Sequence, residues 1–164
     1  MSIRKLSIIN PSRFHQNKYQ LDLKNNQHEI EIKMYLLTNY FHTLNLPHTH
    51  QILKSDLPDV LKTKCFNDSN LPFSKEVRNT EIGHLFEHIL LQYLCQVKIK
   101  NGFEKVTFRG VTKWNWKKEE RGTFNISIEI EPEDVEFFHD AFSKTINLFN
   151  KIMLSENSIS RLIN

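Results

Sequence analysis

The chain has 164 residues, of which 39% are hydrophobic and 25% are charged, and its formal net charge is +3. This length and composition predict one globular domain with a sizeable core, and so mild a charge neither requires nor excludes a nucleic-acid partner. None of the four glycines belongs to a phosphate-binding loop of the Walker or dinucleotide type, so we expect no ATP and no dinucleotide cofactor.

The first part of the chain predicts two strands and a helix. Residues 2–9 and 19–24 are rich in aliphatic or alternating apolar residues, and a turn at Asn10 and Pro11 follows the first of these segments. In residues 30–44 apolar side chains recur at helical spacing. The start of this segment also alternates as a strand does, but its length favours a helix. Pro58 interrupts the amphipathic segment 51–64, so only short helical turns are expected there.

The second half predicts a long helix, two strands and a final helix. The long helix covers residues 80–97, is capped by Asn79 or Thr80, and stops at Gly102. Residues 103–112 and 124–131 alternate as strands, and Pro132 opens the last helix. The expected fold is therefore α+β, with an antiparallel sheet of about four strands packed against helices in the order ββα(α)αββα. Residues 1–154 would form the single domain and residues 155–164 a loosely held tail.

The cysteines and the N-terminal sequence indicate the compartment. Cys65 and Cys95 cannot make a disulfide framework, so a reducing environment is expected. The first residues lack the apolar core of a signal peptide, and no apolar run is long enough to span a bilayer. The sequence thus predicts a cytoplasmic protein that does not cross a membrane.

The segment from His84 to His88 reads H-x-x-E-H, the inverted zinc-hydrolase motif. On a helix the two histidines stand one turn apart on one side, so both imidazoles can reach one metal ion. Glu87 is then placed to take a proton from a water held by that ion. The rest of the helix is almost entirely apolar, which predicts burial. A solvated or hydrogen-bonded histidine pair is the alternative, and the residues alone favour neither.

A catalytic zinc needs a third protein ligand. The strand 124–131 offers Glu129 or Glu131 on its polar side, and Glu129 is nearer the middle. Arg109 on the preceding strand could orient or polarise a substrate, or could simply balance Glu129. Cys95 lies about two turns beyond His88, too far to share the ion, so we assign both cysteines to the core.

Two other polar segments are weaker candidates. The pair His48 and His50 could chelate a metal, but in a polar loop after proline such a pair is more often solvated. The loop 113–122 combines two tryptophans with lysines, as a nucleic-acid platform does. Acidic residues follow at once, so an exposed loop is favoured and no nucleic-acid partner is expected.

The segment GHLFEHI at residues 83–89, followed by FNISIEI at residues 124–130, resembles the N-terminal domain of cyanophycin synthetases. In that family a G-H-x-x-E-H-I/V helix precedes a strand containing arginine and then a strand of the type Y-N-V-V-F-E-Y. Arg109 and Glu129 match those two strands, and the resemblance covers residues 4–153. It implies that His84, His88 and Glu129 are zinc ligands and that Glu87 is the general base. The ATP-grasp and Mur-ligase-like domains of the synthetase are not in this sequence.

The sequence therefore supports two functions. The first is a zinc-dependent hydrolase, a metallopeptidase that cleaves amide bonds in a peptide or a cyanophycin-like polyamide, with Glu87 activating water and Arg109 assisting. The second is a non-catalytic module that binds such a chain for a partner enzyme. Neither needs ATP, and the sequence leaves open whether the protein forms a homo-oligomer.

Overall fold

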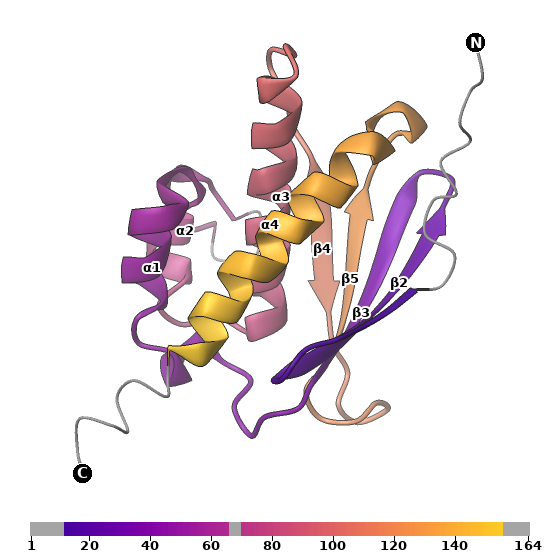
Figure 1. Cartoon of the computed structure of the whole chain (residues 1–164). Helices are drawn as coiled ribbons and strands as arrows, with labels where there is room; N and C mark the ends of the chain where they lie inside the picture. Colours follow the sequence, from indigo (N-terminus) through magenta and orange to yellow (C-terminus); the bar gives the residue numbers. More distant parts are fainter. Residues whose placement is uncertain (1–11, 66–69, 156–164) are drawn as a thin grey trace.

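The computed structural model describes residues 12–65 and 70–155 (Figure 1). Its five strands form one sheet in the spatial order β1-β2-β3-β5-β4, and every neighbouring pair is antiparallel. The strands are β1 (Ser12–His15), β2 (Tyr19–Asn26), β3 (Glu29–Leu36), β4 (Arg109–Lys113) and β5 (Thr123–Glu129). The helices are α1 (Thr49–Asp56), α2 (Phe73–Glu76), α3 (Ile82–Lys100) and α4 (Val135–Leu154), with 3-10 turns η1 (Thr43–Asn45), η2 (Pro58–Lys62) and η3 (Pro132–Asp134) between them. The α+β prediction is confirmed, with five strands in place of about four.

Helices α3 and α4 pack against each other and against one face of the sheet (Figure 1). The alternation of each strand explains this layering, because the side chains facing the helices are buried and the others are largely polar. Tyr19 and Phe149 join β2 to α4 with ring centroids 4.9 Å apart, and the Tyr19 hydroxyl donates to Asn150 Oδ1 at 2.7 Å. Each fully buried phenylalanine contributes about 1.5–3 kcal/mol to this layer.

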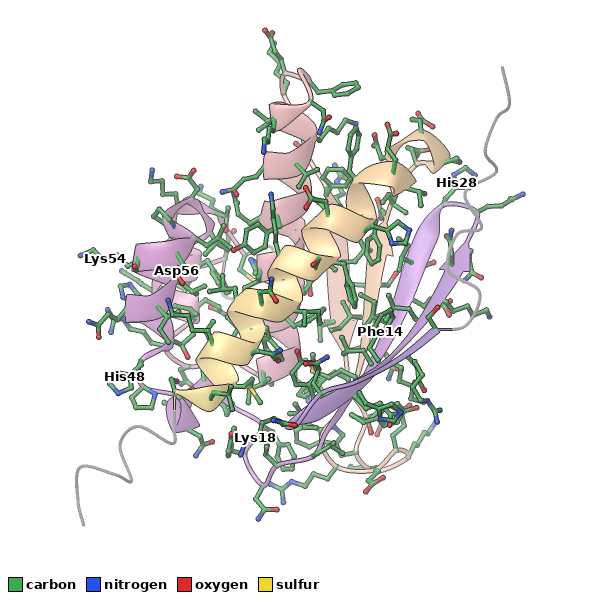
Figure 2. All side chains as sticks on the ribbon, in the orientation of Figure 1. Phe14, Lys18, His28, His48, Lys54 and Asp56 are labelled. Atoms are coloured by element: carbon green, nitrogen blue, oxygen red, sulfur yellow. The ribbon has the colours of Figure 1, made fainter. Side chains whose placement is uncertain are left out.

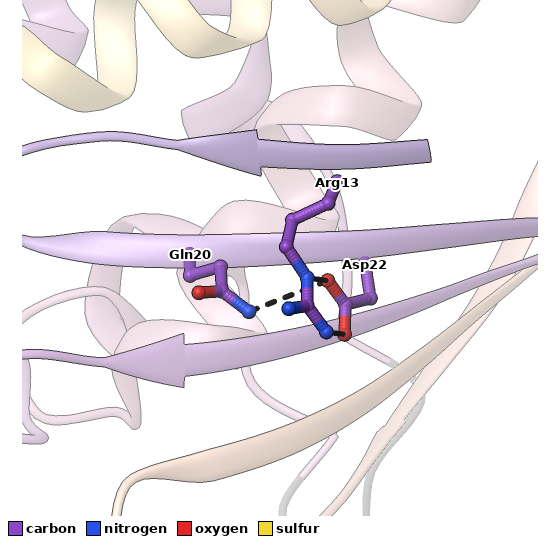
Figure 3. A network of polar contacts seen from close by, with 3 residues as sticks. All are labelled: Arg13, Gln20 and Asp22. Atoms are coloured by element: carbon purple, nitrogen blue, oxygen red, sulfur yellow. Dashed lines mark hydrogen bonds and ion pairs between the residues drawn. The ribbon is translucent and has the colours of Figure 1, made fainter. Parts of the chain in front are cut away.

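The opposite face of the sheet carries polar side chains. Across β1 and β2, Arg13 donates from Nε to Asp22 Oδ1 at 2.8 Å, and Gln20 donates to the same oxygen at 3.4 Å (Figure 3). The guanidinium of Arg13 lowers the pKa of the Asp22 carboxyl below its ordinary value. This face therefore holds charged pairs where the other face holds the core.

The prediction of a helix at residues 30–44 is wrong, because the first part of this segment belongs to strand β3. The buried side chains of β3 are Ile30, Ile32, Met34 and Leu36, which is the period of two that the first half of the segment already showed. A helix over this segment would have placed Leu37 in its buried apolar stripe, but Leu37 is 61% exposed. The central position of β3 between β2 and β5 decides the outcome, since tertiary pairing outweighs helical spacing there.

The other predicted elements are confirmed with shifted bounds. The long helix is α3, and the strands at residues 19–24 and 124–131 are β2 and β5. In the segment 103–112, only the residues from Arg109 onward are strand, and they form β4. The predicted strand at residues 2–9 and nearly all of the predicted tail lie outside the described residues. No helix within the described ranges is long and apolar enough to cross a bilayer.

Candidate metal centre

The start of α3 is held close against the sheet. The Ile82 N–H donates to the Phe41 carbonyl at 2.9 Å, which ties the first turn to the segment after β3. A Cβ placed on Gly83 would lie only 2.4 Å from the ring of Phe124 on β5. Only glycine fits this contact, so the residue before the first histidine sets how closely the motif helix approaches the sheet.

A short pairing between the segments on either side of residues 66–69 brings Cys65 to the same place. The Phe73 N–H donates to the Thr63 carbonyl at 2.8 Å, and the Cys65 N–H donates to the Leu71 carbonyl at 3.2 Å. Phe73 then stacks on His88, with ring centroids 3.9 Å apart and planes 9° from parallel. This arrangement presents the Cys65 thiol to the histidines of α3.

Three potential ligand atoms converge at this point. The Nε2 atoms of His84 and His88 are 3.1 Å apart, and Cys65 Sγ is 3.3 Å from His84 Nε2. The three atoms all lie within 4.8 Å of one another. Tetrahedral zinc, with bonds of about 2.05 Å to nitrogen and about 2.3 Å to sulfur, would set N–N and N–S separations of about 3.3 Å and about 3.6 Å. The His84–His88 and His84–Cys65 separations are within a few tenths of an ångström of these values, and the third, from His88 to Cys65 Sγ, would need to close to about 3.6 Å for the three atoms to bind one zinc ion.

Burial keeps both imidazoles in the neutral form that binds metals. It lowers the pKa of His88 to about 3, with the neighbouring His84 adding to the effect. It also lowers the pKa of His84, although Glu76 and Glu81 partly oppose that shift. Thr80 Oγ1 lies 2.8 Å from His84 Nδ1. If Nδ1 carries the proton and donates to Thr80, the lone pair of His84 is left on Nε2, facing His88.

Glu87 is buried on the side of α3 that faces the sheet. The Thr112 hydroxyl on β4 donates to Glu87 Oε2 in a short hydrogen bond. Burial raises the pKa of Glu87 to about 7, and the bond from Thr112 opposes part of that rise. Among the described residues no hydrogen-bond partner of Oε1 is seen, and Glu87 as a whole is only 5% exposed.

Glu129 and Arg109 lie on the other face of the sheet. They are opposite each other in the β4–β5 register, and both are exposed. Glu129 follows Ile128, whose side chain is buried on the helix side, so strand alternation points Glu129 away from α3. The structure brings His84 and His88 together as expected but places neither Glu129 nor Arg109 with them. Glu131 also lies apart, 3.4 Å from the exposed His28 ring.

Sequence reasoning missed Cys65 and Thr80. Cys65 is buried, as expected of a core cysteine, but its thiol also lies 3.3 Å from His84 Nε2, a contact that the sequence did not predict. Thr80 was expected to cap α3, but the cap residue is Glu81 and no side chain caps the helix. The spacing Thr80 to His84 is one helical turn, and this was the available signal for their contact.

The two weaker candidates stay apart from this centre. His48 lies beside α1 at the outer margin of the molecule (Figure 2). In the loop after β4, Trp116 donates from Nε1 to the Thr123 carbonyl at 2.9 Å and packs on Phe41 and Phe124. That indole is half-buried in the packed loop, whereas Trp114 is 40% exposed.

Comparison with known proteins does not assign the chain to a family. Neither the models of known protein families nor the curated protein sequences give a match to this chain. A function for this chain therefore has to be inferred from the geometry of the site.

Proposed function

We propose that the protein is a zinc-dependent hydrolase whose metal ligands are Cys65, His84 and His88 and whose general base is Glu87. The observation that supports this is the convergence of one thiol and two neutral imidazoles, with the buried carboxyl group of Glu87 next to His88 in the same helix. Three protein ligands are typical of catalytic zinc, which keeps one position for water or substrate, whereas structural zinc usually has four. Cys65 takes the place that we expected Glu129 to fill.

The bound zinc would supply a Lewis acid that lowers the pKa of a coordinated water to about 7 and polarises the substrate carbonyl. Two residues of the chain would orient the histidine ligands. Thr80 would hold His84 in the tautomer that carries its proton on Nδ1, and Phe73 holds the ring plane of His88 by stacking.

Glu87 is the group that moves a proton. With a pKa near 7 the carboxyl exchanges a proton readily at neutral pH, which is the range in which general acid–base catalysis is most efficient. Thr112 holds Oε2, so Oε1 is the oxygen left to receive the proton from water and to return it to the leaving amine.

We expect the substrate to be a peptide or polyamide. This rests on the resemblance of the GHLFEHI helix to cyanophycin synthetases and on the hydrolytic chemistry of a zinc–carboxylate pair. We also place the protein in the cytoplasm, because a reducing compartment keeps Cys65 as a free thiol ligand.

One observation favours the second candidate, a non-catalytic polymer-binding module. The open face of the sheet bears a hollow of about 630 Å³ lined by acidic and basic side chains, among them Asp22, Glu31, Lys33 and Lys113. This hollow is on the opposite face from the histidines, so binding there would not depend on metal chemistry.

Metal analysis of the purified protein tests the centre. We expect about one zinc per chain, as befits a three-ligand site. Its retention should fall sharply in Cys65→Ala and His84→Ala variants. Cys95→Ala is the matched control, because Cys95 lies near the Val106 carbonyl and outside the cluster. Wild-type protein that folds and stays free of zinc after incubation with the ion would refute the proposed centre.

Activity is tested with the Glu87→Gln variant. Glutamine keeps the shape and the bond from Thr112 but cannot take a proton, so zinc should remain bound while cleavage of a peptide library, followed by mass spectrometry, is lost. If zinc binds and neither the wild type nor the variant cleaves any peptide, the non-catalytic module is the better description.

A further inference from the structure

Strand β4 is an edge of the sheet. It pairs with β5 on one side, and among the described residues no backbone group pairs with its other side. Figure 1 shows β4 as the last strand of the sheet, next to α3. An unpaired edge offers backbone donors and acceptors to another chain.

The hydrogen bonds at the ends of β3 and β5 determine which backbone groups point to which neighbour. Leu36 N–H donates to the Gly122 carbonyl, and Ile130 N–H donates to the His28 carbonyl. In an antiparallel pair, directly opposed residues are alternately hydrogen-bonded and not. The even-numbered residues of β5 therefore turn their N–H and C=O groups toward β3, and its odd-numbered residues turn theirs toward β4.

The same alternation extends to β4. Arg109, Val111 and Lys113 are opposite odd-numbered residues of β5, so their backbone groups bond to β5. The backbone N–H and C=O groups of Gly110 and Thr112 consequently point to the free edge. These are two donors and two acceptors in the spacing that an added strand requires.

Gly110 and Thr112 are also the residues of β4 that contact Glu87. The Thr112 hydroxyl bonds to the Glu87 carboxylate, and a Cβ on Gly110 would lie 3.2 Å from Glu87 Cγ. A chain hydrogen-bonded to this edge would run beside the proposed general base. The contacts of Gly110 and Thr112 with Glu87 thus connect the free edge of β4 to the proposed general base.

We propose that the free edge of β4 binds an extended peptide as a sixth, antiparallel strand, and that this peptide is the substrate of the proposed hydrolase. The proposal rests on that function for the peptide's fate but not for its binding. Antiparallel addition continues a sheet in which all pairs are antiparallel and gives the better-aligned hydrogen bonds.

The side chains of β4 on the open face define the preferred sequence. Arg109, Val111 and Lys113 are exposed there, and neither basic side chain forms an ion pair within the described ranges. In an added strand the residues opposite these three make the close, non-hydrogen-bonded pairs. The partner is therefore a peptide with an acidic, an apolar and an acidic residue at alternate positions. The preference for an acidic residue is strongest opposite Lys113, because Arg109 already has Glu129 opposite it on β5.

Fluorescence anisotropy with one labelled peptide tests the edge. The probe is a fluorescein-labelled peptide whose alternate positions carry aspartate, valine and aspartate in that order, with threonine at the positions between them. Its control has lysine at both aspartate positions. The titration uses the zinc-free wild type, zinc-loaded wild type and Glu87→Gln protein, so that binding is measured whether or not cleavage occurs. We expect the aspartate peptide to bind at least about tenfold more tightly than the lysine peptide.

N-methylation of the probe supplies a matched pair that leaves the protein unaltered. A methyl on a threonine between the acidic and apolar residues removes an N–H that points at Gly110 or Thr112, and should weaken binding about tenfold or more. A methyl on the valine removes an N–H that points away from β4, and should change binding little. Lys113→Glu should reverse the preference for aspartate over lysine. Lys54→Glu, on α1 at the outer margin of the molecule (Figure 2), should leave that preference unchanged.

Equal weakening by both methylations would overturn the proposal, as would equal binding of both peptides or no binding of either by folded protein. A stable dimer that the peptide does not dissociate would assign the edge to a second copy of the chain and would overturn it as well. Binding with the expected methylation pattern but without zinc or cleavage would support the edge and refute the hydrolase.

Discussion

The Gly83→Ala substitution probes the contact that seats the motif helix on the sheet. Glycine in a helix is unfavourable, so helix propensity alone predicts that alanine at this second position of α3 stabilises the protein by up to about 1 kcal/mol. The structure predicts the opposite, because the added Cβ would lie 2.4, 2.6 and 2.7 Å from the Cγ, Cδ1 and Cβ atoms of Phe124.

The magnitude follows from how far the two elements must separate. Ordinary carbon contacts begin near 3.4 Å, so helix and strand must move apart by about 1 Å. Phe124 is fully buried and its ring packs on Trp114 and Trp116, which prevents it from turning aside. Overpacking of this kind costs about 1–3 kcal/mol, so after the gain in propensity we expect a net loss of about 1–2 kcal/mol. For a domain of this size that lowers Tm by about 2–8 °C.

Thermal unfolding followed by circular dichroism measures this loss, and zinc affinity reports whether the helix has moved. A helix displaced from the sheet carries His84 with it, so we expect weaker zinc binding together with the lower Tm. Lys100→Ala, at the exposed end of the same helix, is the control and should change neither value. A Gly83→Ala variant that melts at or above the wild-type temperature would refute the close contact. Helix propensity alone would then explain the effect of the substitution.

Three further predictions concern separate parts of the fold. Thr80→Val removes the hydrogen-bond partner of His84 and should weaken zinc binding about tenfold to 100-fold in a chelator competition, with little change in fold. Phe149→Ala empties a fully buried site under β2 and should cost about 3–5 kcal/mol in urea unfolding, whereas Leu44→Ala at an exposed position should cost little. Arg13→Ala should raise the pKa of Asp22 toward its ordinary value in an NMR titration, because it removes the guanidinium that stabilises the carboxylate. An unchanged midpoint would contradict the pairing.

The long elements with a single clear period could be predicted from the sequence, and those with two competing periods could not. Helix α3 and strand β5 each show one pattern over their whole length, and both were placed within a few residues. The segment that contains β3 satisfies a helical spacing and an alternation at once. What settles it is pairing with β5, whose residues lie roughly 90 positions further along the chain, and no local pattern contains that information.

The candidate site divides in the same way. The i, i+4 spacing of His84 and His88 fixes their proximity on any helix, so the sequence was sufficient for that pair. The third proposed ligand depends on how the chain returns to α3, and Cys65 reaches the histidines through the backbone pairing of its segment with Leu71. Glu129 was expected as the third ligand because it lies on the polar side of its strand and matches a family-like pattern, but the same alternation places it on the face opposite to buried Ile128 and away from α3.

Strand alternation also separates the proposed general base from the proposed peptide-recognition residues. On β4 the inward side chain of Thr112 holds Glu87, while the outward side chain of Arg109 lies on the far side of a hydrogen-bonded sheet. In the proposed reaction, a carbonyl attacked beside Glu87 would be out of reach of Arg109, so this arginine could not assist the attack as the sequence suggested. Its charge can act only on groups along the open face. An Arg109→Ala change should therefore raise KM for an acidic peptide and leave kcat unaltered, whereas a fall in kcat at constant KM would restore a catalytic role to this residue.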